Sequence, residues 1–325
     1  MPFWIKKINW ENSAAHQELL SMFLSQYRLK DLYHNKGWFS EWQRVLVESP
    51  KAAINRYIEK GYLVLAPLPN ILDCSFKLTE LKAMAKKYGI PISGKKADVI
   101  SRLVTYDKEG LSQKVSQITD IYSCSELGRP IAVRYKQFRE EERNQCEMTM
   151  LEALRNRDLP KAVSLFVAYQ KNQVFPTGNF SEGNITDFEY SLSFVFSAHP
   201  GILAGIDDQT LYSFRVAAGM NQLWMSGISS KWLPEGFVWN YRLDINTTCN
   251  MLGFYAVYQK QLNDFRNMDR RYIKGVQISS ADDSCSECRK FKNRVFDLEH
   301  VPELPNPNCT NKMGCRCNLY LVWKV

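Results

Sequence analysis

The chain has 325 residues, enough for about two domains, and its 45% apolar and 23% charged residues are those of a soluble globular protein and exclude a disordered chain. No segment approaches the roughly 18 apolar residues of a membrane span, and the N-terminal residues lack the pattern of a signal peptide, so we expect a cytoplasmic protein with no membrane partner. The net charge of +8 is uneven: residues 1–107 carry +6, residues 108–268 carry −1 and residues 269–325 carry +3. Basic ends suit a polyanionic partner, although a basic surface that only aids solubility explains the charge equally well.

Residues 1–66 are predicted to be helical. Apolar side chains from Leu19 to Tyr27 recur at helical spacing, and Ser49-Pro50 is a typical start for a further helix that ends at Gly61. The two histidines of this region, His16 and His34, are expected on the surface.

Residues 76–105 are predicted to be a compact unit of two short helices. Thr79 is the expected cap of the first helix, which ends at Gly89. Ile90-Pro91-Ile92 is expected to be extended because a residue before proline avoids helical angles. The second helix covers residues 95–104.

This unit resembles the SAP motif, a helix-extended-helix module that binds duplex DNA, often with a preference for AT-rich or structured sites. The residues that carry the resemblance are Leu78-Thr79-Glu80-Leu81-Lys82, Gly89, Ser93-Gly94-Lys95-Lys96, Ile100 and Arg102-Leu103. They cover about a tenth of the chain. The resemblance implies double-stranded DNA as the partner.

The charge of the unit supports the same partner independently. Seven basic and two acidic side chains give a net charge of +5, and the second helix begins beside two lysines, where a phosphate is favoured. The unit has no aromatic wedge, so we expect contacts to the DNA backbone with weak sequence selectivity. The predicted DNA-binding residues are Lys77, Lys82, Lys86, Lys87, Ser93, Gly94, Lys95, Lys96 and Arg102. A solvated basic hairpin, or a fold reused for protein contacts, is the alternative.

Residues 108–268 are predicted to form a helical middle domain that offers a surface for protein partners. The expected helices are 134–154, 159–174, one starting at Asp207 or Asp208, and 244–267. Residues 188–196 fit a strand and a helix about equally, and a helix capped by Thr186 and Asp187 is preferred.

Residues 272–325 are predicted to form a small β unit around a metal site. Five of the nine cysteines lie in the last 41 residues: Cys285, Cys288, Cys309, Cys315 and Cys317. An odd count without an export signal favours metal binding over disulfides. Two pairs of thiolates can close a tetrahedral, structural Zn²⁺ site, with Cys315 and Cys317 competing for the fourth position and His300 as a weaker alternative. A redox CxxC motif is the other interpretation, but the βαβ context that it requires is absent.

The same tail resembles the C-terminal end of the Mu-type phage head-morphogenesis (minor capsid) family. The shared elements are the CxxC at Cys285, the short strand at residues 294–296, a proline-rich approach to Cys309, and Gly314-Cys315-Arg316-Cys317. Two features depart from that family: Asn306 stands where a histidine is common, and residues 310–314 are an insertion. The resemblance implies a metal site more than a capsid role.

The sequence shows no catalytic motif. It has four histidines and neither a phosphate-binding loop nor a nucleophile elbow. The sequence therefore predicts a mainly helical protein of several domains (1–66, 76–105, 108–268 and 272–325), which binds DNA without catalysis. A phage or mobile-element assembly factor, virion-associated, is one alternative, and a metal-dependent nuclease is another.

Overall fold

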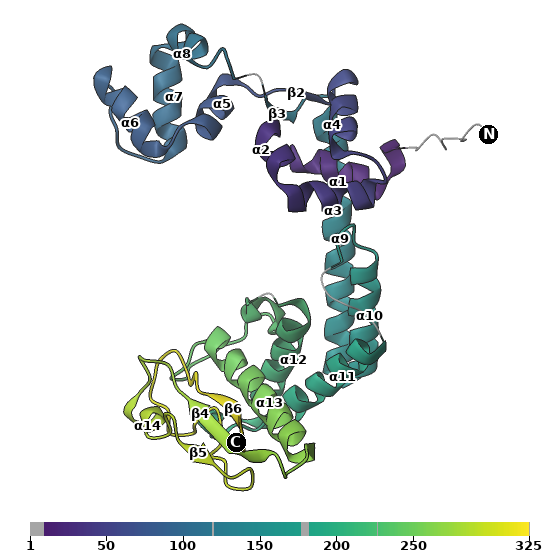
Figure 1. The fold of residues 1–325 in the computed structure, drawn as a ribbon, viewed down its shortest axis with the longest axis vertical. Helices are drawn as coiled ribbons and strands as arrows, with labels where there is room; N and C mark the ends of the chain where they lie inside the picture. The colour runs from purple at the N-terminus through teal and green to yellow at the C-terminus, as the bar shows by residue number, and fades with distance from the viewer. Residues whose placement is uncertain (1–9, 119, 177–181, 226, 325) are drawn as a thin grey trace, which may run out of the picture. The chain divides into compact units, whose positions relative to one another are not determined.

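The computed structural model describes residues 10–118, 120–176, 182–225 and 227–324, and the chain divides into two compact units, 1–142 and 143–325. The predicted fold class is confirmed, because the chain is mainly helical with small antiparallel sheets (Figure 1). A cysteine cluster lies near the C-terminus. None of the described helices is both long and apolar enough to cross a membrane.

Unit 1 begins with short helices around a three-stranded antiparallel sheet. The helices are η1 (Trp10–Asn12), α1 (Ala14–Met22), α2 (Leu29–His34), α3 (Lys36–Leu46) and α4 (Pro50–Glu59). The strands are β1 (Tyr27–Arg28), β2 (Leu63–Leu65) and β3 (Ile121–Cys124), in the order β1-β3-β2. The predicted start at Ser49-Pro50 is confirmed, since Ser49 is the N-cap of α4. The sheet was not predicted from the sequence.

Four helices lie between β2 and β3 in the chain: α5 (Leu68–Ser75), α6 (Leu78–Lys87), α7 (Lys96–Tyr106) and α8 (Lys108–Lys114). They have a core of their own, formed by Leu72, Leu81, Ala85, Val99, Ile100, Leu103, Leu111 and Val115. The two predicted helices of residues 76–105 are α6 and α7. The expected cap at Thr79 is wrong: α6 begins at Leu78 with Lys77 as N-cap, because the Glu80 carboxylate accepts the Lys77 N–H at 2.6 Å.

The contacts divide the chain into two units, whereas four ranges were predicted from the sequence. The strand at residues 121–124 pairs with β1 and β2, and Leu111 of α8 packs in the core of the inserted helices, so residues 108–124 lie with unit 1. The long helix α9 (Gly128–Arg155) begins in unit 1 and ends in unit 2.

Unit 2 contains α10 (Leu159–Lys171), α11 (Glu182–Ser197), α12 (Asp208–Trp224) and α13 (Ile245–Asn267), with short turns η2 (Gly201–Leu203) and η3 (Ser229–Trp232). Asp207 accepts a backbone N–H group at the start of α12, which confirms one of the two caps predicted there, and α13 starts beside Asp244, as predicted, with Asp244 also accepting a backbone N–H group. The helix preferred for residues 188–196 is confirmed as part of α11. Its expected caps are wrong, since Thr186 and Asp187 lie inside a helix that starts at Glu182. Part of the expected loop at residues 172–184 lies outside the described residues.

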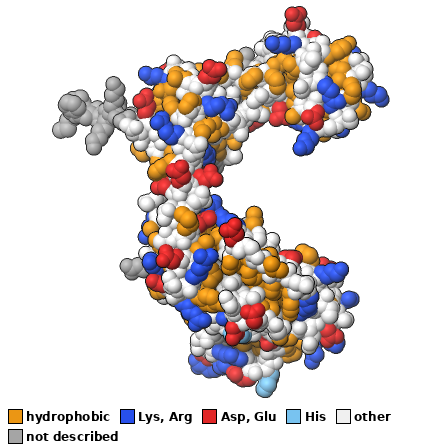
Figure 2. All heavy atoms as spheres, turned by 180° about the vertical axis from the view of Figure 1, so that it is seen from behind, with side chains coloured by type: hydrophobic (Ala, Val, Ile, Leu, Met, Phe, Trp, Pro, Cys, Tyr) orange, Lys and Arg blue, Asp and Glu red, His pale blue; other side chains and the backbone are white. Residues whose placement is uncertain are grey.

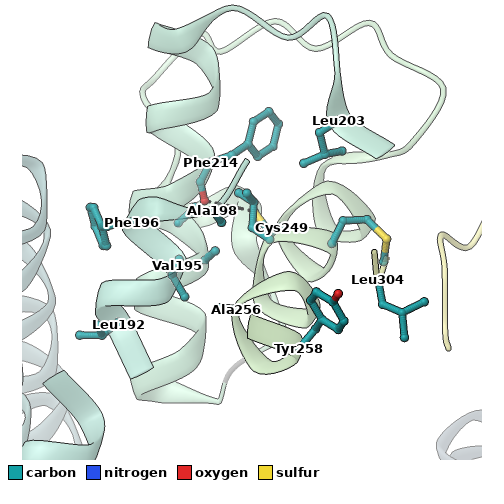
Figure 3. Close-up of a cluster of buried hydrophobic side chains, with 14 of the residues drawn as sticks. Leu192, Val195, Phe196, Ala198, Leu203, Phe214, Cys249, Ala256, Tyr258 and Leu304 are labelled. Carbon is teal, nitrogen blue, oxygen red and sulfur yellow. Dashed lines mark hydrogen bonds between the residues drawn. The ribbon is translucent and has the colours of Figure 1, made fainter. Parts of the chain in front are cut away.

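The tail completes unit 2. Strands β4 (Ile273–Ser279), β5 (Val295–Phe296) and β6 (Asn318–Trp323) form an antiparallel sheet in the order β5-β4-β6, and α14 (Ser286–Arg289) follows β4. Leu304 of the tail belongs to the same core as Tyr258 of α13 and Phe214 of α12 (Figure 3). The tail and the helices therefore share one hydrophobic core.

Candidate nucleic-acid interface and metal centre

The turn into α7 is built around Gly94 and Asp98. Gly94 has φ +98°, and a Cβ placed there would lie 2.7 Å from Asp98 Oδ2. The same carboxylate accepts the Lys95 N–H at 2.8 Å. The start of α7 thus needs glycine and already holds one negative group of the protein, so its backbone contributes less to phosphate binding than the sequence suggested.

Two of the predicted DNA-binding side chains are already bonded to other residues of the chain. Lys96 Nζ lies 3.1 Å from Asp73 Oδ1 on α5. The Arg102 guanidinium donates to the carbonyls of Asp98, at 3.0 Å, and of Ser93. These groups fasten α7 to α5 and to the preceding turn, and Asp73 was missed because it precedes the predicted unit.

The other five lysines have no acidic partner among the residues that the structure describes. Lys77, Lys86, Lys87 and Lys95 are exposed, and Lys82 is half-buried. Figure 2 shows Lys and Arg side chains on the visible surface of the molecule. Unpaired ammonium groups keep their full attraction for an external anion, so these five carry the positive field of the SAP-like unit.

The tail brings cysteine side chains together in two overlapping groups. Cys285, Cys288 and Cys309 form one group, and Cys288, Cys315 and Cys317 form the other. Sγ of Cys285 lies 3.8 Å from Sγ of Cys309, and Sγ of Cys288 lies 3.7 Å from Sγ of Cys315. Four sulfurs at about 2.3 Å from a tetrahedral ion are separated by about 3.8 Å. The spacing therefore fits a metal ion held by thiolates.

The arrangement separates Cys315 from Cys317. Cys315 Sγ accepts the Asn306 N–H at 3.2 Å, and the Asn306 side-chain amide points to Cys288 Sγ at 3.7 Å. Donors of this kind orient and stabilise ligating thiolates. Within the described residues, neither Cys315 nor Cys317 belongs to the group of Cys285 and Cys309, so the contacts of Cys315 with Asn306 and Cys288 distinguish the two. His300 is exposed and belongs to neither group.

The pKa shifts of the cysteines show how the cluster would respond to a bound cation. Burial raises the pKa of Cys288, and the neighbouring Cys315 and Cys309 raise it further. At Cys285, burial acts in the same direction, but N–H groups of Cys288 and Thr310 outweigh it and lower the pKa to about 6. Several thiolates in one buried place repel each other, and a bound divalent ion removes that repulsion.

Contacts of the cysteine cluster join it to α13 and to the loop before that helix. The Arg242 guanidinium donates to the Cys309 carbonyl at 2.5 Å, and the Cys315 N–H points to Met251 Sδ of α13 at 3.3 Å. Gly314, with φ +75°, packs directly against Met251 and Thr247. The metal centre thus rests on α13.

One histidine lies elsewhere than expected. His16, predicted on the surface, is 1% exposed, because Tyr57 and Glu48 from α4 and the preceding turn cover it. No local pattern around residue 16 indicates these partners, which lie 32 and 41 residues away.

Comparison with known proteins supports the first of the two sites. The family model of the SAP domain matches residues 75–108, which confirms the SAP assignment of this segment. No match was found among curated proteins or solved structures. The resemblance of the tail to the phage head-morphogenesis family receives no support. The chain therefore contains a SAP domain, which suggests nucleic-acid binding, and a cysteine cluster that can hold a metal ion.

Proposed function

We propose that this protein binds double-stranded DNA through its SAP domain and acts by binding rather than by catalysis. The observation that carries the proposal is the set of five lysines without acidic partners on the segment that matches the SAP family: Lys77, Lys82, Lys86, Lys87 and Lys95. Phosphates supply the missing negative charge.

The same residues favour the DNA backbone over the base edges. Lysine binds phosphate as a flexible point charge, whereas bidentate contacts to guanine or adenine are typical of arginine, asparagine and glutamine. Arg102, the one arginine of the predicted set, is occupied by the Ser93 and Asp98 carbonyls. We therefore propose binding with weak sequence selectivity.

The number of contacts sets the salt dependence. If all five lysines neutralise a phosphate, the slope of log K against log salt is about −4.5, and affinity falls about 500-fold between 50 and 200 mM salt. Fluorescence anisotropy with a labelled duplex measures this slope.

Lys95 and Lys96 form a matched pair for the test. Lys95→Ala removes an unpaired charge and is expected to reduce the slope by about 0.9. Lys96→Ala removes a charge already paired with Asp73 and is expected to leave the slope nearly unchanged. Absence of duplex binding at 50 mM salt, or equal effects of the two substitutions, would contradict the proposal.

We further propose that the metal is a structural Zn²⁺ ion held by Cys285, Cys288, Cys309 and Cys315. The Sγ pairs Cys285–Cys309 and Cys288–Cys315 each have the spacing of two ligands of one tetrahedral zinc ion, and four thiolate ligands leave no open position for a substrate. Elemental analysis of protein purified without added metal should give one zinc per chain. Cys315→Ser should lose the ion, and Cys317→Ser should keep it. Metal-free protein with a Cys285–Cys288 disulfide would support the redox alternative instead.

A further inference from the structure

A cavity of about 490 Å³ lies in unit 1, away from the SAP domain helices, among η1, α1 and α9. Its volume falls in the range of roughly 300–1,000 Å³ that is usual for small-molecule sites. His16 of α1, Trp10 of η1, and Arg134 and Phe138 of α9 are among the residues that line it. We ask what ligand this lining suits.

His16 is one of several polar residues that line the cavity, and its ring is held in one orientation. Its Nε2 lies 2.7 Å from Oε1 of Glu48, and Glu48 also accepts two hydrogen bonds from Arg56, at 2.8 and 2.7 Å. The paired carboxylate can only accept, so Nε2 carries the proton.

The other ring nitrogen of His16, Nδ1, is buried and makes no hydrogen bond to the described residues. A buried polar atom without a partner costs about 1–3 kcal/mol. With less than 1 Å² of accessible surface, Nδ1 is out of reach of a ligand in the cavity, so His16 forms a rigid part of the cavity wall.

The remaining lining is mixed, because it includes the polar side chains of Glu11, Asn12 and Gln17 as well as Arg134 and aromatic rings. Trp10 packs against Tyr57 and Tyr62, with 5.4 and 5.7 Å between the ring centroids, and the Arg56 guanidinium lies 5.8 Å from its ring. Phe138 is 54% exposed, which is unusual for a large aromatic side chain and leaves its face open. Arg134 is exposed and has neither an ion pair nor a hydrogen bond with any described residue.

We propose that this cavity binds a nucleotide, with the base against Phe138 and the phosphate on Arg134. A base offers a flat ring for stacking, and every base has such a face. The guanidinium is suited to phosphate. Glu11 also lines the cavity, so the phosphate lies toward Arg134 and away from that carboxylate.

Isothermal titration of the full chain with the four deoxynucleoside 5′-monophosphates tests the proposal. We expect saturable binding of at least one of them, and much weaker binding of its nucleoside and of inorganic phosphate. His16 is buried and holds Glu48, so its substitution would disturb the fold. Phe138→Ala and Arg134→Ala are used instead, because both side chains are exposed.

Phe138→Ala is expected to weaken binding at least about fivefold, from the lost stacking, and Arg134→Ala about tenfold, from the lost charged hydrogen bond. Met148→Ala and Arg129→Ala, exposed residues of the same helix that do not line the cavity, are matched controls and should bind normally. Lys87→Ala/Lys95→Ala should weaken duplex binding and leave nucleotide binding unchanged.

Two possible sources of the nucleotide are separated by a second titration. A 5′-phosphorylated single-stranded trinucleotide that binds more tightly than the monophosphate identifies a strand end as the ligand, and weaker binding identifies a free nucleotide. No heat with any monophosphate at millimolar concentration, or an affinity that Phe138→Ala and Arg134→Ala leave unchanged, would overturn the proposal.

Discussion

Gly314→Ala tests how closely the metal centre depends on the helix beneath it. A Cβ at residue 314 would lie 2.6 Å from Met251 Cε, 2.9 Å from Met251 Sδ and 3.0 Å from Thr247 Cγ2. Met251 is fully buried, so any movement of its side chain away from the new Cβ takes place inside the core. Gly314 also has φ +75°, which alanine adopts only with strain.

A matched control separates the free-energy cost of the backbone strain from that of the contact with Met251. Gly236 has φ +71°, and a Cβ there would meet nothing within 4 Å. Gly236→Ala is therefore expected to cost only the backbone strain, about 1–2 kcal/mol. Gly314→Ala adds overpacking of a buried side chain, typically about 1–3 kcal/mol, so the total is about 2–5 kcal/mol.

Pulsed thiol labelling of Cys249 during urea denaturation follows unit 2 alone. Cys249 is 2% exposed, and burial raises its pKa to about 12, so it reacts only when unit 2 opens. Gly314→Ala should react at a lower urea concentration than Gly236→Ala. Equal midpoints for the two variants would refute the contact between the metal-site turn and α13.

Three further outcomes are expected. Hydrogen bonds, chiefly from Arg56 and then from His16, keep the pKa of Glu48 below its ordinary value of 4.5. The stability that Glu48 contributes is therefore present above that pH and is lost as the pH falls below it. Glu48→Gln should lower the urea midpoint at pH 7 and make the midpoint less dependent on pH in the acid range. Iodoacetamide should modify exposed Cys74 before buried Cys124, whose pKa burial raises to about 11, as peptide mass spectrometry can show; early modification of Cys124 would contradict its burial. A chelator that removes the proposed metal ion should unfold the tail and also lower the urea midpoint of Cys249 labelling, because the tail and the helices of unit 2 share one core. An unchanged midpoint would show that the tail unfolds independently.

The helices could be predicted where the chain carried its own signals. The apolar positions 188, 192, 195 and 196 fit a helix face, and the structure has α11 there. Carboxylates at Asp207 and Asp244 marked the starts of two helices, because a cap bonds to N–H groups only a few residues away.

The rest depended on partners far along the chain. The β1-β3-β2 sheet joins Arg28 to Ile121 in strands of two to four residues, too short for a periodic pattern. The SAP domain lysines were all visible in the sequence, but the partner that neutralises Lys96 was not. The sequence alone could not distinguish Cys315 from Cys317, because only the fold places the backbone N–H of Asn306 beside Cys315 Sγ.

The register of β2 and β3 has a consequence for how the SAP domain is attached. Leu65 pairs with Tyr122, so the chain leaves the sheet and returns to it at neighbouring positions, with α5 to α8 between them. The SAP domain is thus an insertion into a β-hairpin, and its separate core does not depend on that of its host. Replacement of residues 67–120 by an Asn-Gly turn keeps Ala66 opposite Ile121, as a two-residue hairpin requires, and should leave the host fold intact. The same junction offers a place to graft another recognition module of similar end-to-end spacing.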